Sequence, residues 1–185
     1  FWSRPSEGAL YLAVESWGTD SELAGIWRYS PASGKMEKAA KTSGYFVQAI
    51  QPDGMDRVWI YARKYEQDHV ISAILSWDYS APNVEVVFEN RGMGNAAGQR
   101  VFRRVLMSTF SAPKPPYHRR GNYLWTGMPF GRVHLADGTF ERFSINGKYE
   151  EVLHFFDLVS GLRVLVRDAS DRYGVADLSD KALSQ

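Results

Sequence analysis

The chain has 185 residues, and with 44% hydrophobic and 23% charged residues its composition is that of a folded globular protein, not a disordered one. Its 22 basic and 21 acidic residues leave a net charge of +1, which disfavours nucleic acid as a partner, and no apolar run approaches the ~20 residues that cross a bilayer. The absence of cysteine excludes disulfides, thiolate metal sites and thiol nucleophiles.

Neither the composition nor the N-terminus fixes the compartment. No signal peptide is visible, and an extracytoplasmic location is compatible with a cysteine-free chain. Because the chain begins at Phe1 and not at a methionine, we expect a processed product or a fragment of a longer chain.

The first half of the chain predicts two groups of short strands that are rich in β-branched and aromatic residues and separated by turns. The predicted strands cover residues 8–16, 25–30 and 35–40 in the first group, and 45–50, 57–63, 70–79 and 84–89 in the second. The two groups share a motif, because Trp27-Arg28-Tyr29-Ser30 matches Trp77-Asp78-Tyr79-Ser80 about 50 residues later. A period of this length with about four strands per unit is typical of a β-propeller.

The second half predicts two further units. Residues 95–110 fit a helix, by the spacing of Val101, Phe102, Val105 and Leu106, or a strand, which the period favours. Residues 111–120 form a predicted Pro-rich basic loop. Short strands follow at residues 123–126, 132–136 and 140–144, and then at residues 150–157, 161–168 and 173–178. The dipeptide Asp137-Gly138 favours a two-residue hairpin turn.

We therefore predict an all-β, β-propeller-like fold in which four consecutive four-stranded antiparallel units form a single domain or a propeller fragment. The units cover approximately residues 1–40, 45–90, 99–147 and 150–185. They either close as a four-bladed ring or belong to a larger ring whose remaining blades lie elsewhere.

One stretch resembles a known type of propeller blade. Residues 124–144 contain Leu124-Trp125-Thr126-Gly127, then Gly131, then Asp137-Gly138, and then the aromatic pair Phe140 and Phe143. This order is similar to a blade of the regulator-type propellers of bacterial sensors. Ser76-Trp77-Asp78 resembles the start of the Asp-containing turn in sialidase-type propellers. Both resemblances imply a propeller fold.

The basic segment that follows the third unit's first strand is the main candidate binding region. Its residues are Lys114, Tyr117, His118, Arg119 and Arg120, with Arg100, Arg103 and Arg104 upstream. We expect it to contact an acidic protein partner or phosphates, since long loops on rigid scaffolds often carry function. The alternative is a solvated insertion.

The recurring aromatic residues provide a second candidate site. Trp27 and Trp77 are the proposed contact residues, and Tyr29, Tyr79, Trp59, Tyr61 and Trp125 recur near them in the repeat. If these rings face a groove, they would stack on sugar rings. The alternative is that they form the packing layer between blades.

Signals for chemistry are few. The four histidines (His69, His118, His134 and His154) have no metal-ligand spacing, and no cofactor fingerprint occurs, so we assign no metal, cofactor or catalytic residue. Residues 168–174 have oxygen ligands that fit Ca²⁺ or, alternatively, a polar turn. Glu15, Asp78, Glu89 and Asp168 are the acidic residues from which a glycosidase pair would have to come.

The primary functional hypothesis is a non-catalytic binding, scaffold or sensing module whose partner is another protein or the remaining propeller blades. The alternative is a carbohydrate-binding or glycoside-processing propeller domain.

Overall fold

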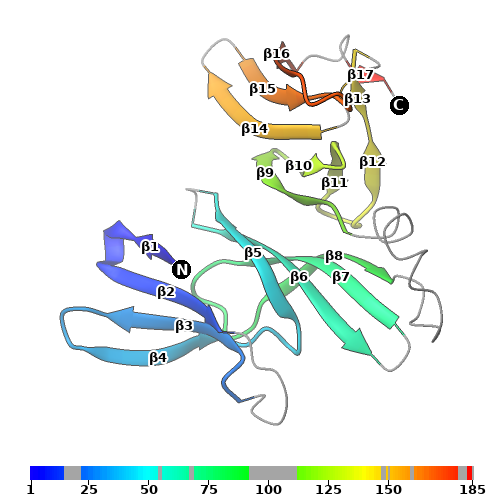
Figure 1. Cartoon of the computed structure of the whole chain (residues 1–185). Helices are drawn as coiled ribbons and strands as arrows, with labels where there is room; N and C mark the ends of the chain where they lie inside the picture. The colour runs from blue at the N-terminus through cyan, green and yellow to red at the C-terminus, as the bar shows by residue number, and fades with distance from the viewer. Residues whose placement is uncertain are drawn as a thin grey trace. The chain divides into compact units, whose positions relative to one another are not determined.

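A computed structural model describes residues 1–14, 22–53, 56–66, 69–91, 112–146, 149, 151–158, 161–178 and 183–184. The chain divides into two compact units, Phe1–Ala112 and Pro113–Gln185 (Figure 1). Apart from the short 3-10 helix η1 (Pro5–Glu7), the regular structure of the described residues is strand. The all-β prediction is therefore confirmed, with four antiparallel sheets of three or four strands. No described helix is long and apolar enough to cross a membrane.

The first unit contains two sheets in which each strand pairs with the next along the chain. Sheet 1 consists of β1 (Trp2–Arg4), β2 (Ala9–Val14), β3 (Gly25–Ser30) and β4 (Lys35–Ala40). Sheet 2 consists of β5 (Phe46–Pro52), β6 (Val58–Glu66), β7 (His69–Trp77) and β8 (Glu85–Arg91). This order is that of an antiparallel meander, which short turns are sufficient to connect.

Sheets 1 and 2 share one hydrophobic core. Ile26 of sheet 1 packs in the same cluster as Val58, Ile60 and Ala62 of β6, which alternate along the strand and so point to one face. The other face of β6 is buried too, because Trp59 and Tyr61 are only 1% and 4% exposed. Sheet 2 therefore has large apolar side chains on both faces.

The second unit contains two larger sheets and one small one. Sheet 3 consists of β9 (Lys114–Arg120), β10 (Tyr123–Met128), β11 (Gly131–His134) and β12 (Phe140–Arg142). Sheet 4 has three strands, β14 (Glu151–Leu158), β15 (Gly161–Arg167) and β16 (Tyr173–Asp177). A short sheet pairs β13 (Ser144–Ile145) with β17 (Leu183–Ser184).

Sheets 3 and 4 enclose an aromatic and aliphatic core. Trp125 stacks on Phe130 with 5.7 Å between ring centroids, and both pack in one cluster with Val152, Val164 and Val166 of sheet 4. The guanidinium of Arg132 lies 4.2–5.5 Å from the centroids of three aromatic rings, including Trp125. Of the residues that resemble a sensor blade, Leu124, Trp125, Thr126 and Phe143 are thus buried here.

Two hairpin turns share a structure that the sequence comparison missed. In each, the main-chain N–H of an aspartate donates to the carbonyl of an arginine four residues later, at 3.0 Å for both Asp53–Arg57 and Asp168–Arg172. In return the arginine N–H donates to the aspartate Oδ1, at 3.2 and 3.0 Å. The residue before each arginine has a left-handed φ, of 69° and 57°. Asp-x-x-Asp-Arg is therefore a repeated turn motif. The sequence alone indicated polar turn residues at both places but not the shared hydrogen-bond pattern.

Three local predictions need correction or remain outside the structure. The predicted loop at residues 111–120 is wrong over its greater part, because β9 pairs along its length with β10. The turn at Asp137-Gly138 is longer than two residues, because His134 N–H bonds to the Thr139 carbonyl and closes a larger loop. The fourth sheet has three described strands where four were expected. The predicted helix or strand at 95–110 lies outside the described residues.

Candidate functional site

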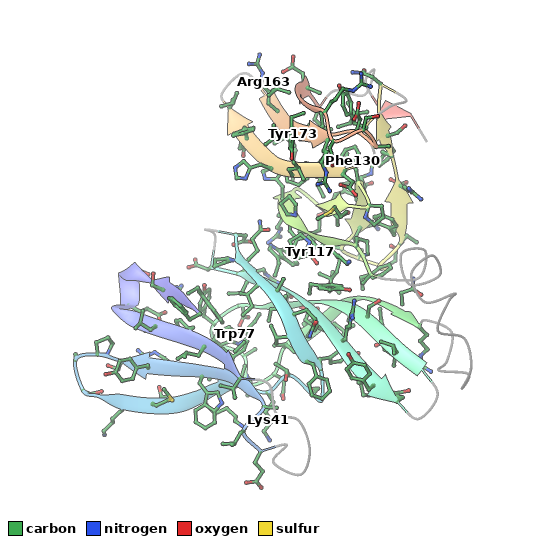
Figure 2. The ribbon with its side chains drawn as sticks, viewed as in Figure 1. Lys41, Trp77, Tyr117, Phe130, Arg163 and Tyr173 are labelled. Carbon is green, nitrogen blue, oxygen red and sulfur yellow. The ribbon has the colours of Figure 1, made fainter. Side chains whose placement is uncertain are left out.

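The predicted basic segment is strand β9, one of the two edge strands of sheet 3. Lys114, Arg119 and Arg120 are exposed. Tyr117, which Figure 2 labels, is buried, and its hydroxyl donates to the Pro113 carbonyl at 2.9 Å. Tyr117 and Arg119 lie on the same face of the strand, so alternation does not explain this difference; the exposed arginines are the last two residues of β9, beside its turn to β10. The upstream arginines at 100, 103 and 104 lie outside the described residues.

His118 contributes little positive charge to this segment. Its imidazole is half-buried and stacks on Phe155 of β14, with 5.6 Å between centroids and 24° between planes. Burial lowers the pKa of His118, and the nearby Arg120 lowers it further, whereas Asp157 opposes both effects. The basic surface of β9 therefore consists of Lys114 and the two arginines at its end.

The two candidate tryptophans occupy different environments despite their matching motifs. Trp27 lies inside β3, is half-buried, and donates from Nε1 to the Leu23 carbonyl at 2.8 Å. Trp77 is the last residue of β7, is 1% exposed, and donates to the Ala81 carbonyl at 2.8 Å. Trp77 is thus a core residue, as the packing alternative expects, and a ligand has no access to its ring.

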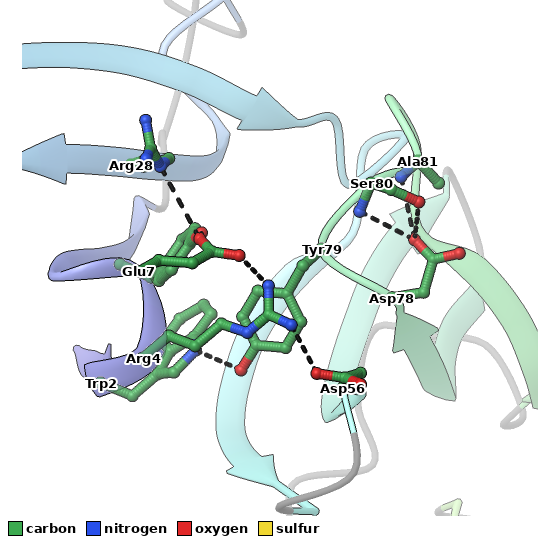
Figure 3. Close-up of polar contacts among 10 residues, drawn as sticks. Trp2, Arg4, Glu7, Arg28, Asp56, Asp78, Tyr79, Ser80 and Ala81 are labelled. Carbon is green, nitrogen blue, oxygen red and sulfur yellow. Dashed lines mark hydrogen bonds and ion pairs between the residues drawn. The ribbon is translucent and has the colours of Figure 1, made fainter.

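Trp77 belongs to an aromatic cluster that joins sheet 1 to the loop after β7. Tyr11 contacts Trp2, Trp77 and Tyr79 at centroid separations of 5.4, 5.6 and 5.3 Å. Trp2 Nε1 donates to the Tyr79 hydroxyl at 3.1 Å, and the guanidinium of Arg4 lies 4.3 Å from the Tyr79 centroid (Figure 3). These contacts hold sheets 1 and 2 together.

Charged side chains lie at the edge of the aromatic cluster and pair with one another. Arg4 forms ion pairs with Glu7 and with Asp56, the latter at 2.5 Å (Figure 3). The Tyr11 hydroxyl donates to Glu7 at 2.6 Å, and burial together with this carboxylate raises the pKa of Tyr11 to about 12. All of these groups are engaged with one another, so we assign the cluster a structural role.

The acidic residues considered for a glycosidase pair serve local structure where the structure describes them. Asp78 accepts hydrogen bonds from Ala81 N–H, Ser80 N–H and the Ser80 hydroxyl at 2.9–3.0 Å, and these bonds lower its pKa. Glu89 accepts a hydrogen bond from the Tyr45 hydroxyl at 2.6 Å. Glu15 lies outside the described residues.

The possible calcium loop at residues 168–174 is a polar turn in this structure. The Asp168 carboxylate accepts from Ser170 N–H at 2.8 Å and from Arg172 N–H at 3.0 Å, and it pairs with the Arg172 guanidinium at 2.9 Å. Within the described ranges, no group of three or more His, Asp or Glu side chains is arranged to hold a metal ion.

A surface that sequence reasoning missed lies on sheet 4. Four large apolar side chains from two of its strands are exposed: Phe156 (38%), Leu158 (44%), Tyr173 (64%) and Val175 (65%). The cross-strand pairs Phe156–Arg163 and Leu165–Val175 place these side chains on the face opposite the core residues Val164 and Val166. We call this surface the outer face of sheet 4.

Charged residues on the outer face are paired with one another. Arg163 bonds Asp177 at 2.6 Å, and Arg167 bonds Glu151 at 2.7 Å (Figure 2 labels Arg163 and Tyr173). Exposed apolar side chains on one face of a sheet are typical of protein interaction surfaces. Here the charged side chains between them are already neutralised by ion pairs with one another. The sequence signal for this surface was weak, since the outer face of Gly161–Arg167 carries a single aliphatic residue, Leu165, between Arg163 and Arg167.

Comparison with known proteins provides no relative from which a function could be inferred. No protein-family profile matches the chain, and no curated protein or solved structure matches it significantly.

Proposed function

We propose that this chain is a non-catalytic protein-binding module of propeller-like architecture, and that the outer face of sheet 4 is its contact surface. The observation that carries the proposal is the exposure of Tyr173 and Val175 on β16, at 64% and 65%, on the same face of sheet 4 as the exposed Phe156 and Leu158 of β14, with β15 between the two strands. Burying such side chains contributes roughly 25 cal/mol per Å² of apolar area, so their exposure favours a partner that covers them.

Three features support the propeller-like part of the proposal. The four sheets are consecutive antiparallel meanders, and sheet 2 has buried aromatic residues on the face away from sheet 1, as a blade with a neighbour on each side would have. The Asp-x-x-Asp-Arg turn occurs in both units, where it joins the first two strands of sheet 2 and the second and third strands of sheet 4.

Spin labelling tests the architecture directly, since the chain has no cysteine of its own. Cysteines would replace exposed Met36 in the first unit and exposed Ala136 in the second. A propeller packs its blades rigidly, so we expect one narrow distribution of distances between the labels. A broad or multiple distribution would show two independently oriented units and would exclude a closed ring.

The carbohydrate-binding alternative loses its main support. Trp77 is inaccessible, and Trp27 is half-buried, with its indole N–H engaged by Leu23 and the ammonium of Lys38 5.2 Å from its ring centroid. A sugar platform needs an open aromatic face. Protein binding is therefore the function that we propose.

Peptide selection tests the binding role. Random peptides displayed on phage would be selected on the intact chain, and the enriched clones would be assayed against a Tyr173→Ser, Val175→Ser double variant. We expect binding to fall at least tenfold, because both anchors are lost. Val86→Ser is the control, since Val86 is an exposed valine (46%) of sheet 2, outside the proposed contact surface. Clones that bind the double variant normally would overturn the proposal, and glycan-array binding with no peptide enrichment would favour the alternative.

Lys114, Arg119 and Arg120 form a second proposed contact, for acidic residues of the same partner. Their exposure leaves them free to attract such residues at long range, and this attraction weakens as ionic strength rises. We expect an Arg119→Gln, Arg120→Gln variant to bind acidic selected peptides with a smaller salt dependence than the parent chain. An unchanged salt dependence would remove β9 from the proposed contact surface.

A further inference from the structure

We infer that strand β16 is a strand-addition site, where the exposed edge of sheet 4 takes up an extended segment of a partner polypeptide. The inference rests on the proposed function and names the kind of partner. Sheets 1, 2 and 3 each continue from their third strand to a fourth, which is β4, β8 or β12. Sheet 4 ends at β16 within the described chain, and β17, the next described strand, pairs with β13 instead.

The backbone direction of β16 follows from its pairing with β15. Leu178 N–H donates to the Leu162 carbonyl at 2.8 Å, and the register then proceeds without a shift from Arg163–Asp177 to Arg167–Tyr173. In an antiparallel pair, alternate residues direct both backbone groups to the same neighbour. The N–H and C=O groups of Tyr173, Val175 and Asp177 therefore point to the outer edge.

This edge lacks the features that normally prevent pairing with other strands. Such features are lysines, prolines, bulges and very short strands. β16 has the sequence Tyr-Gly-Val-Ala-Asp and pairs without a bulge, and its only charged residue is Asp177. In contrast, the fourth strands of the other sheets carry several charged residues each, as in the sequences KMEKAA, EVVFENR and FER.

These fourth strands indicate what the partner segment looks like. Each places a large apolar residue opposite a residue of the third strand: Met36 opposite Tyr29, Phe88 opposite Ile74, and Phe140 opposite Val133. Charged residues flank that apolar residue in β4, and a charged residue follows it directly in β8 and β12. The expected occupant is thus a short antiparallel strand of another polypeptide, with one large apolar residue opposite Val175 and charged residues beside it.

The side chains of β16 fit this occupant. A strand at the edge would place alternate side chains beside Tyr173 and Val175 on the outer face and so cover the two most exposed of the apolar residues there. Arg163 and Asp177 already neutralise each other at 2.6 Å, so affinity would come from backbone hydrogen bonds and the apolar contact. Selection by charge would be secondary.

Amide hydrogen exchange with a defined probe tests the inference. The probe is a capped synthetic peptide with the sequence of Glu85–Arg91, EVVFENR, added to the intact chain and followed by NMR. We expect exchange at the amides of Tyr173, Val175 and Asp177 to slow at least tenfold at saturation. The amides of Gly174 and Ala176, which already face β15, should change little. A peptide that is N-methylated at alternate residues, on the side facing β16, is the control and should give no protection.

A pair of variants separates edge pairing from contact with the face. Val175→Pro removes the outward N–H without removing a bond to β15, and proline is tolerated on edge strands. Val175→Thr keeps the N–H and the branched shape. We expect the proline variant to weaken peptide binding at least tenfold and the threonine variant to weaken it less than about threefold. If circular dichroism shows that the proline variant does not fold, the N-methylated peptide provides the same test from the ligand side.

The other outcomes are equally informative. Peptide binding that shifts side-chain signals of Tyr173 and Phe156 but protects none of the three amides would overturn strand addition and leave the outer face as a contact surface. If this peptide does not bind while phage-selected peptides still bind through Tyr173 and Val175, strand addition is likewise overturned and the outer face remains a contact surface. Protection that rises with protein concentration alone would identify a second copy of the chain as the occupant and overturn the choice of partner. Loss of all peptide binding to the face would instead refute the proposed function.

Discussion

Replacing Trp77 and Trp27 in turn by alanine tests how tertiary packing distinguishes two copies of one motif. Trp77 is 1% exposed, and its ring contacts Tyr11 and Tyr79 at 5.6 and 5.0 Å between centroids. Removing a buried ring of this size costs about 3–5 kcal/mol, and the Ala81 carbonyl also loses its indole donor. A loss of this size is a large share of the ~5–15 kcal/mol that stabilises a typical domain.

Trp27→Ala should be far milder. Full burial of a large apolar side chain contributes about 1.5–3 kcal/mol, and the Trp27 ring is only half-buried, so we expect a loss of about 1 kcal/mol. The bond to the Leu23 carbonyl is exposed to solvent and adds little.

Guanidinium unfolding followed by far-ultraviolet circular dichroism measures both losses without relying on tryptophan fluorescence. Hydrogen exchange of the β6 and β7 amides assigns the loss to the first unit. A Trp27→Ala variant as destabilised as Trp77→Ala would refute the assignment of the two rings to different environments. The comparison also bears on ligand assays, since lost binding in Trp77→Ala would reflect unfolding and not a missing contact.

Three further perturbations have defined outcomes. Asp168→Ala should lower the free energy of urea unfolding by about 2–3 kcal/mol, because the carboxylate (4% exposed) accepts hydrogen bonds from two turn amides and pairs with Arg172. Asp168→Asn keeps a hydrogen-bond acceptor and should lower it less. Equal losses in the two variants would contradict this role of the carboxylate. Burial lowers the pKa of His118 in the folded chain below its unfolded value of about 6.5, so near that pH the unfolded chain binds more protons than the folded chain. Stability should therefore fall as the pH drops from about 7.5 to about 5.5. The His118→Gln variant should lose this part of the pH dependence, and a variant with the same pH dependence as the parent chain would contradict it. Gly127→Ala should lower the melting temperature and destabilise the fold by about 1–3 kcal/mol, because the new methyl group would overlap Pro116 of β9 and the Val152 carbonyl oxygen of β14. A variant as stable as the parent chain would show that β9 and β14 can move away from Gly127 at little cost.

Local sequence features determined the strands of this protein. β-branched and aromatic runs bounded by Gly, Pro, Asn and Asp predicted strands in all four sheets, and their spacing predicted the meander order, because sequential antiparallel strands need only short turns. The prediction failed at 114–120, where two prolines and four basic or polar residues suggested a loop. Prolines are acceptable in β9 because it is an edge strand of sheet 3, and a residue's place in a sheet cannot be derived from its own segment.

The candidate site depended on the tertiary structure. Trp27 and Trp77 have similar local motifs, yet one ring is half-exposed and the other is buried against Tyr11 and Tyr79. Likewise, Tyr173 and Val175 look like ordinary strand residues, and only the tertiary structure shows that they lie on the exposed outer face of sheet 4. Alternation along a strand assigns side chains to two faces, but which face is covered is decided by residues distant in the sequence. The sequence by itself therefore determined where the strands lie, and the packing of the sheets decided which of their residues are free to bind.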